Sequence, residues 1–178
     1  MNQIFSQALR ELNRPNDNLS IAKWQEQFLR FANEAIVDIA ASYRLWRKET
    51  ARLQDNRLNT DNLSYACVKV LTLERDGVRI PFYYGTNSDE LRTKNVPDGE
   101  LTITYRYMPP TVTTVLQSPE LPACLHPLIV TFIVARERIQ LDSAARSGSK
   151  VNLDLYETMK KRLRVSVATP DDQSIYGI

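Results

Sequence analysis

The sequence predicts an α+β fold: a helical bundle of about four helices with an inserted small antiparallel β-sheet and an extended C-terminal tail. Apolar residues recur at intervals of three and four towards both ends of the chain, which is typical of helices. Between them apolar and polar residues alternate, and Asp76-Gly77 supplies a turn between two such segments. We therefore expect one domain over 1–164 and a tail at 165–178, with helices at 2–13, 20–47, 122–143 and 152–164 and a β-block at about 50–108.

The first two helices are separated by a turn at 13–18, where proline, asparagine and aspartate disfavour a helix. Ser20 is the predicted N-cap of the second helix. Its apolar stripe is wide enough for more than one neighbour. Its far end, 43–48, is aromatic and basic, which suits a helix C-terminus because cations complement the helix dipole.

Alternation begins near Ala66, and a second strand returns over 78–84. Pro81 cannot donate to a ladder, so that strand should be an edge or end early. A third, half-buried strand follows over 100–107. Residues 52–58 are a further candidate edge strand, and a short helical turn is expected around 88–91.

The third helix is apolar almost all round in its first half, which predicts burial. Its second half carries Arg136, Glu137 and Arg138, so we expect it to emerge into solvent or towards a partner. A turn at 143–150 should then lead to a last helix capped by Asn152.

The composition restricts the classes of function. The chain has 178 residues and a formal net charge of +2, a near balance that indicates neither a nucleic-acid-binding protein nor an acidic tail. No apolar run reaches the roughly 20 residues that span a bilayer, and the N-terminus lacks a signal-peptide pattern. Cys67 and Cys124 lack metal-ligand spacing and suggest a reducing compartment.

No motif for catalysis, a cofactor or a metal is present, so the sequence predicts a protein that is not an enzyme. The lone histidine, His126, has no evident orienting partner, and we expect it to be structural or interfacial. Glu34 and Asp38 lie one helical turn apart, but a solvated helix face explains that spacing better than a carboxylate pair.

Two sets of basic residues stand out as candidates for channel or inter-subunit contacts. The alternative for the first set, which lies beside Tyr43 and Trp46, is phosphate binding or an ordinary helix end. The tail ends in apolar residues, and docking on a partner is one expectation for it, a solvated tail the other. The basic candidates are Arg44, Arg47, Lys48, Arg136, Arg138 and Arg146.

Two segments resemble tailed-bacteriophage head–tail adaptor proteins, also called head completion or connector proteins. Residues 24–40, WQEQFLRFANEAIVDIA, resemble the long helix that follows a short first helix in those proteins. Residues 120–136, ELPACLHPLIVTFIVAR, resemble their second landmark, an LP…HP start of a buried helix. The strand block that ends at 103–109 also fits, so the likeness covers about residues 1–164.

The resemblance implies a structural virion protein without catalysis. Such adaptors form a homo-oligomeric ring, typically of twelve subunits, beneath the portal protein, extend the channel for double-stranded DNA, and give the tail or a nozzle or stopper protein its attachment face. It implies a place in the neck of the virion, with assembly in the host cytoplasm and no membrane. It also implies that the last helix and the tail engage the portal, through Tyr156, Lys160, Leu163, Val165, Val167, Ile175, Tyr176 and Ile178.

Near balance of charge suits such a passive channel, because tight phosphate contacts would stall the DNA. Two alternatives stay open: a tail-side stopper or terminator protein, and a nucleic-acid-binding regulator that uses the basic residues near Trp46.

Overall fold

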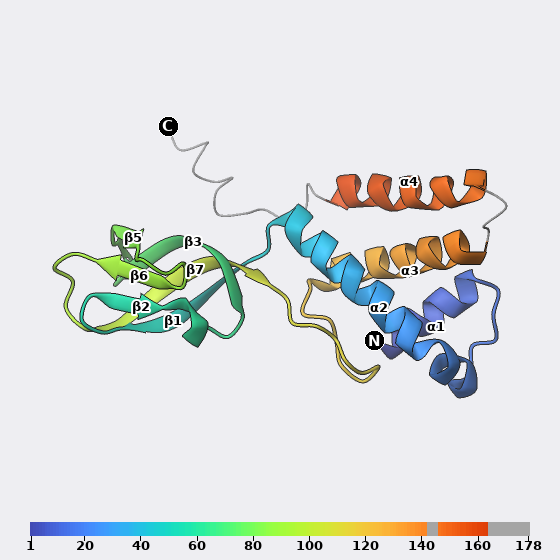
Figure 1. Ribbon diagram of the computed structural model, residues 1–178, viewed down its shortest axis with the longest axis horizontal. Coiled ribbons are helices and arrows are strands. Elements are labelled where there is room, and N and C mark those ends of the chain that lie inside the picture. The colour runs from blue at the N-terminus through green and yellow to red at the C-terminus, as the bar shows by residue number, and fades with distance from the viewer. Residues whose placement is uncertain (142–145, 164–178) are drawn as a thin grey trace. The chain divides into compact units, whose positions relative to one another are not determined.

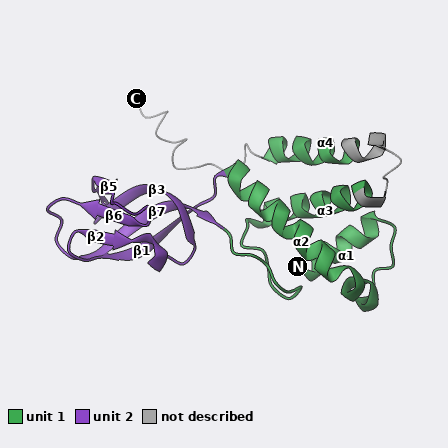
Figure 2. Ribbon diagram, viewed as in Figure 1, with its two compact units in different colours: residues 1–43, 109–178 green, residues 44–108 purple. Residues whose placement is uncertain are grey.

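The computed structural model describes residues 1–141 and 146–163, without the side chains of 140, 141 and 146–150. Within them the chain is a mixture of helices and antiparallel strands, as the sequence predicted. It divides into two compact units (Figure 2), which we call the helical unit, residues 1–43 with the described part of 109–178, and the β unit, residues 44–108. The second unit is thus an insertion in the first, and it begins earlier than the predicted position near 50. The predicted tail lies outside the described residues.

The helical unit contains α1 (Asn2–Glu11), α2 (Asn18–Tyr43), the short 3₁₀ turn η2 (Ala123–Leu125), α3 (His126–Leu141) and α4 (Arg146–Leu163). Helix α3 contacts each of the other three helices (Figure 1), and Leu128, Ile129 and Ile133 are fully buried. This explains why its sequence is apolar almost all round. None of the described helices is long and apolar enough to cross a membrane.

Helix α2 begins two residues before the predicted start. Asp17, not Ser20, is its N-cap: the Asp17 carboxylate accepts a hydrogen bond from the Ser20 amide over 2.7 Å. That bond favours the ionised carboxylate and lowers the pKa of Asp17. Helix α1 ends at Glu11 rather than 13, because Asn13 takes a left-handed conformation with φ of 55°.

The predicted helix 20–47 was wrong at its C-terminal end. Helix α2 ends at Tyr43, and Arg44 adopts a left-handed conformation with φ of 52°, which stops the helix. The next residues form the strand β1 (Trp46–Leu53), which pairs along its whole length with β7 (Gly99–Met108). The pairing partners of this segment lie 46 to 60 residues away in sequence, so tertiary pairing decides its conformation.

The last two helices also differ from their predicted bounds. The segment predicted as a helix over 122–143 is η2 followed by α3. Helix α4 starts at Arg146, so Asn152 is not its N-cap and lies inside it. There the Asn152 side chain accepts a hydrogen bond from Arg138 Nη1 over 2.9 Å. Asn152 therefore links α4 to α3 instead of capping a helix.

The β unit holds two antiparallel sheets. The first has the strand order β1-β7-β3-β4, with β3 (Ala66–Arg75) and β4 (Val78–Arg79) joined by the predicted Asp76-Gly77 turn. The second has the order β2-β6-β5, from Arg57–Asn59, Glu90–Thr93 and Phe82–Tyr84. A 3₁₀ turn, η1 (Thr60–Asn62), follows β2. Pro81 separates β4 from β5, and each lies at the edge of its sheet, as predicted.

Two parts of the β unit were not foreseen. The predicted helical turn around 88–91 is a tight turn at 87–90, closed by the Glu90 amide on the Asn87 carbonyl oxygen at 3.2 Å. Its second half was wrong, because β6 starts at Glu90, pairs on both sides and buries Leu91. A hairpin joins β1 to β2, with Asp55 and Asn56 both at positive φ and reciprocal backbone hydrogen bonds between Gln54 and Arg57. Aspartate and asparagine adopt positive φ more readily than most residues, so the adjacent Asp55 and Asn56 could have indicated this turn from the sequence.

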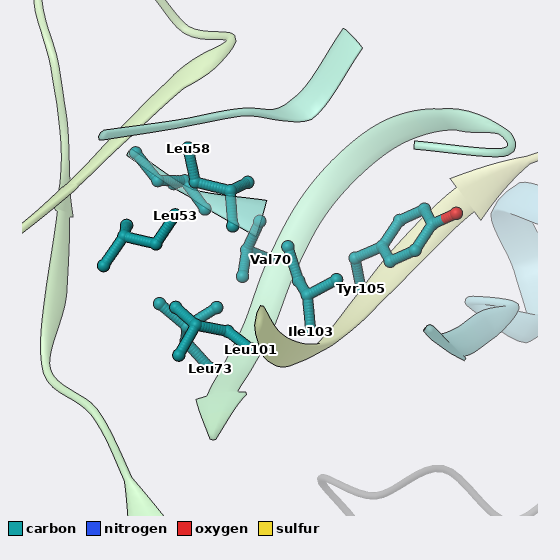
Figure 3. Packing of buried hydrophobic residues seen from close by; sticks show 8 residues of the cluster. Leu53, Leu58, Val70, Leu73, Leu101, Ile103 and Tyr105 are labelled. Atoms are coloured by element: carbon teal, nitrogen blue, oxygen red, sulfur yellow. The ribbon is translucent and has the colours of Figure 1, made fainter. Parts of the chain in front are cut away.

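The core of the β unit forms between its sheets. Side chains from β1, β2, β3 and β7 converge there (Figure 3), and β7 contributes Leu101, Ile103 and Tyr105 from one face, as its alternation predicted. Burial, and then the negative charge of Glu49, raises the pKa of Tyr105 to about 12. The cluster comprises Leu53, Leu58, Val70, Leu73, Leu91, Leu101, Ile103 and Tyr105.

Candidate interaction surfaces

The last helix was predicted to present Tyr156, Lys160 and Leu163 to a portal. Tyr156 is instead 1% exposed, and its ring packs edge-on against Phe132 with centroids 5.1 Å apart. Its hydroxyl donates a hydrogen bond to Asp38 on α2. Burial first, and then that bond, raises the pKa of Tyr156. Tyr156 therefore holds α4 in the helical unit.

Lys160 has a similar position. Its Nζ lies 2.7 Å from Asp38 Oδ2 and 2.9 Å from Glu157 Oε1, while the Tyr43 hydroxyl donates to its carbonyl oxygen over 2.6 Å. Burial lowers the pKa of Lys160, but the hydrogen bonds to the two carboxylates outweigh it, and the pKa is raised. Leu163 is half-buried, and Val165, Val167, Ile175, Tyr176 and Ile178 lie outside the described residues.

Helix α4 does have an exposed apolar pair that the sequence analysis did not single out. Val151 is 65% exposed and Leu155 51% exposed, and they lie one helical turn apart. A spacing of four residues between apolar side chains usually indicates the buried face of a helix. On α4 it instead marks a second apolar patch, about 120° round the helix from Tyr156, and this patch is the better candidate for contact with a partner.

The cations of α3 stabilise the helical unit itself. Arg136 forms an ion pair with Glu34 of α2 over 3.0 Å, and its guanidinium lies near the rings of Phe31 and Phe132. Arg138 donates to the Glu11 carbonyl oxygen over 3.1 Å. The side chain of Arg146 lies outside the described residues.

The second half of α3 also contains a buried charge, contrary to the expectation that it emerges into solvent. Glu137 is 1% exposed. It accepts hydrogen bonds from Arg14 over 2.7 Å and from Gln27 over 2.6 Å. The Arg14 guanidinium lies 3.8 Å from the centre of the Trp24 ring. This cluster ties the turn between α1 and α2 to α3.

Arg44, Arg47 and Lys48, predicted at a helix end, belong to the β unit. Arg47 lies over the Tyr65 ring at 4.6 Å, and Lys48 pairs with Glu74 over 3.2 Å. Trp46 is 38% exposed. The six basic candidates are therefore divided between two structural units. Arg47 and Lys48 stand at the start of β1, and Arg44 lies just before it.

The first segment that carries the family resemblance contacts the connection before the second segment, at Val112, and also the second segment itself. The side-chain amide of Asn33 exchanges two hydrogen bonds, both 2.9 Å, with the backbone of Val112. Glu34, its neighbour, forms the ion pair with Arg136. His126 Nε2 lies 3.2 Å from the Leu121 carbonyl oxygen, within the LP…HP segment, where it ties the chain to the start of α3.

The described residues contain no group of three or more histidine, cysteine, aspartate or glutamate side chains that could hold a metal ion. Cys124 is exposed and Cys67 half-buried, and both are free thiols. Burial raises the pKa of Cys67 to about 11, so its reactive thiolate is scarce near neutral pH. The sequence matches no protein-family model, and no curated protein matches it.

Proposed function

We propose that the protein is a structural subunit of the neck of a tailed bacteriophage. In this proposal it forms a head–tail adaptor ring beneath the portal, typically of twelve copies. The ring extends the channel through which double-stranded DNA passes and provides the attachment face for the tail. The chain acts by position and contact, without catalysis or cofactor.

The observation that carries the proposal is the contact between the two segments that resemble the adaptor family. Asn33 and Glu34 are the polar residues of the Asn-Glu-Ala element in the first segment. Asn33 holds the backbone at Val112, and Glu34 pairs with Arg136 at the end of the second segment. The polar residues at these two positions thus have defined partners within the helical unit, which supports the view that the resemblance reflects a shared architecture.

The order of elements supports the same proposal. Among the described residues, two α-helices precede the inserted β unit and two follow it. This is the layout on which the adaptor resemblance rests. The exposed pair Val151 and Leu155 on α4 gives a ring subunit an apolar patch for contact with a neighbour or with the portal.

The test is negative-stain imaging and native mass spectrometry of this protein mixed with the portal protein of the same genome. A ring of this protein seated on the portal supports the proposal. Absence of any complex, with both proteins shown to be folded by circular dichroism, refutes the portal-side position. The same mixture with the tail-side proteins then tests the stopper or terminator alternative.

A matched pair of variants makes this test sharper. Replacing Val151 and Leu155 by serine removes the exposed apolar pair and should leave the fold intact, because both side chains are already in solvent. The control replaces Val78, 68% exposed on the β unit, by serine. We expect the double variant to lose ring assembly and the control to retain it.

A further inference from the structure

The outer face of helix α2 lies at the surface of the helical unit along its whole length. Seven residues recur on it at intervals of three and four, on the side opposite to the residues that α2 buries. Leu19 is 83% exposed and Val37 is 51% exposed, so each end of this face carries an apolar side chain in solvent. Read from the C-terminal end, the outer face consists of Ala41, Val37, Glu34, Arg30, Glu26, Lys23 and Leu19.

The C-terminal half of the outer face is hollowed. Six residues of α2 line a shallow hollow of about 750 Å³ there: Arg30, Asn33, Glu34, Val37, Asp38 and Ala41. Asp38 also holds the end of α4, because Lys160 Nζ lies 2.7 Å from its Oδ2. Helix α4 ends three residues later, at Leu163, so the chain that follows starts within about one helical turn of this contact.

The residues after α4 lie outside the described part of the chain, but their sequence has the pattern of this face. Two valines come first, at 165 and 167, then two aspartates, at 171 and 172, and then Ile175, Tyr176 and Ile178. The outer face, read from Ala41 towards Leu19, is also apolar at both ends and charged between them. The two patterns therefore run in the same order from the point where α4 contacts α2.

The spacings of the two patterns also agree. Ala41 and Leu19 are 22 positions apart, which is about 33 Å along a helix. Val165 and Ile175 are 10 positions apart, which is also about 33 Å in an extended chain. On this scale the two aspartates fall about 20–23 Å from Val165, between the levels of Arg30 at about 17 Å and Lys23 at about 27 Å.

The charges on the middle of the outer face favour an acidic segment. Lys23 and Arg30 lie near the rings of Trp24 and Phe31, and neither forms an ion pair with a carboxylate in the described part of the chain. Glu26 lies between the two cations and opposes the aspartates. Two cations against one carboxylate still leave this stretch with a net positive charge.

We propose that residues 165–178 dock on the outer face of α2 of their own chain, running antiparallel to the helix. The attachment of α4 at Asp38 fixes where the segment starts. Such a short connection gives the segment an effective concentration on the order of millimolar, so weak contacts are enough to hold it. A docked segment is not available to other proteins, and the contact therefore regulates any binding that uses the tail. It lies within the helical unit and does not depend on whether the protein is a portal-side adaptor.

The test uses the whole chain, labelled with ¹⁵N and carrying one nitroxide spin label. Cys67 and Cys124 are replaced by alanine, and the label is attached either through Ser166→Cys or through Ser174→Cys. The label at 166 should broaden the amide signals of 37–41, and the label at 174 should broaden those of 19–23. This order follows from the antiparallel direction, because the segment starts at the C-terminal end of α2.

Variants of α2 test the role of charge through the same broadening. Lys23→Gln combined with Arg30→Gln should lower the equilibrium constant for docking by about two- to tenfold, as expected for two exposed ion pairs. Glu26→Gln removes the opposing carboxylate and should raise it. The control, Arg79→Gln combined with Lys94→Gln, removes two exposed cations of the β unit and should leave the broadening unchanged.

Four outcomes overturn the proposal. The first is that neither label broadens the outer face of α2, and the second is that the two labels broaden it in the reverse order. The third is equal docking in the Lys23 and Arg30 variant and in the control. The fourth is broadening that appears only when spin-labelled chains without ¹⁵N are mixed with ¹⁵N-labelled chains, which would place the segment on α2 of a second copy.

Discussion

Replacing Arg14 by methionine should destabilise the helical unit far more than the loss of an ordinary surface charge. The side chains of Arg14 and Glu137 are 15% and 2% exposed, so the substitution leaves a buried carboxylate without its cation. Breaking a buried pair in this way costs about 3–5 kcal/mol. We expect the lower end, about 3 kcal/mol, because Gln27 keeps one hydrogen bond to Glu137.

A double variant tests the reason for that loss. Arg14→Met combined with Glu137→Leu removes both charges, and apolar replacement of a whole buried pair is often close to neutral. The double variant should therefore be more stable than Arg14→Met alone by about 1–2 kcal/mol. Some loss should persist, because Gln27 loses an acceptor and Trp24 loses its cation contact.

The matched control is Arg136→Met. Its ion pair with Glu34 has a similar distance, 3.0 Å, but the two side chains are 40% and 38% exposed. Exposed pairs contribute about 0–1 kcal/mol, and methionine keeps much of the packed stem of arginine.

The assay is urea unfolding followed by far-ultraviolet circular dichroism. With a slope of about 1–3 kcal/mol per M, a loss of 3 kcal/mol lowers the midpoint by roughly 1–3 M. A midpoint for Arg14→Met equal to that of Arg136→Met would refute the reasoning, since it would mean that Glu137 is stabilised by other groups or by solvent.

Three further predictions follow from the helical unit. Phe28→Ala should lower the free energy of unfolding by about 3–5 kcal/mol in the same urea assay, because Phe28 is 1% exposed and packs on Phe5 and Trp24; a nearly neutral result would contradict its place in the core. Tyr156 has a raised pKa in the folded state, so its contribution to stability is complete below the unfolded pKa near 10 and is lost as the pH rises. Between pH 8 and 11 the melting temperature should therefore fall less steeply for Tyr156→Phe than for the unaltered chain. Parallel curves would refute the contact with Asp38. Truncation of 165–178 should leave the circular dichroism spectrum unchanged and abolish portal binding, and a truncated chain that still assembles on the portal would exclude the tail from that contact.

The helices and the hairpin turn were predictable because their signals are local. The apolar period of α3 matches a helix surrounded by neighbours, and Asp76-Gly77 forms the tight turn that its residue types favour. The exchange of helix for strand after Tyr43 was not predictable, because aromatic and basic residues suit either conformation there. The strand is stabilised by pairing with β7, which no local pattern contains.

The candidate contact residues were less predictable than the fold. Tyr156, Lys160 and Arg136 carry polar groups that usually face solvent, yet each contacts a residue on α2, more than 100 positions away in sequence. Glu137 was expected in solvent for the same reason and is buried against Arg14. Charge and polarity along one helix do not specify which neighbour satisfies them.

The pairing of β1 with β7 also has an entropic consequence for the helical unit. Leu45 and Tyr107 form a hydrogen-bonded pair, so the two ends of the insertion are held about 5.5 Å apart when the β unit is folded. When the helical unit folds, it then has to bring together only two chain ends, at the end of α2 and at residue 109, that the folded β unit already holds close. If 44–108 were unfolded, the same closure would span a long loop and cost roughly 2–3 kcal/mol more. Folding of the β unit thus stabilises the helices through the chain connection itself, and a destabilising change deep in the sheet lowers the stability of both units.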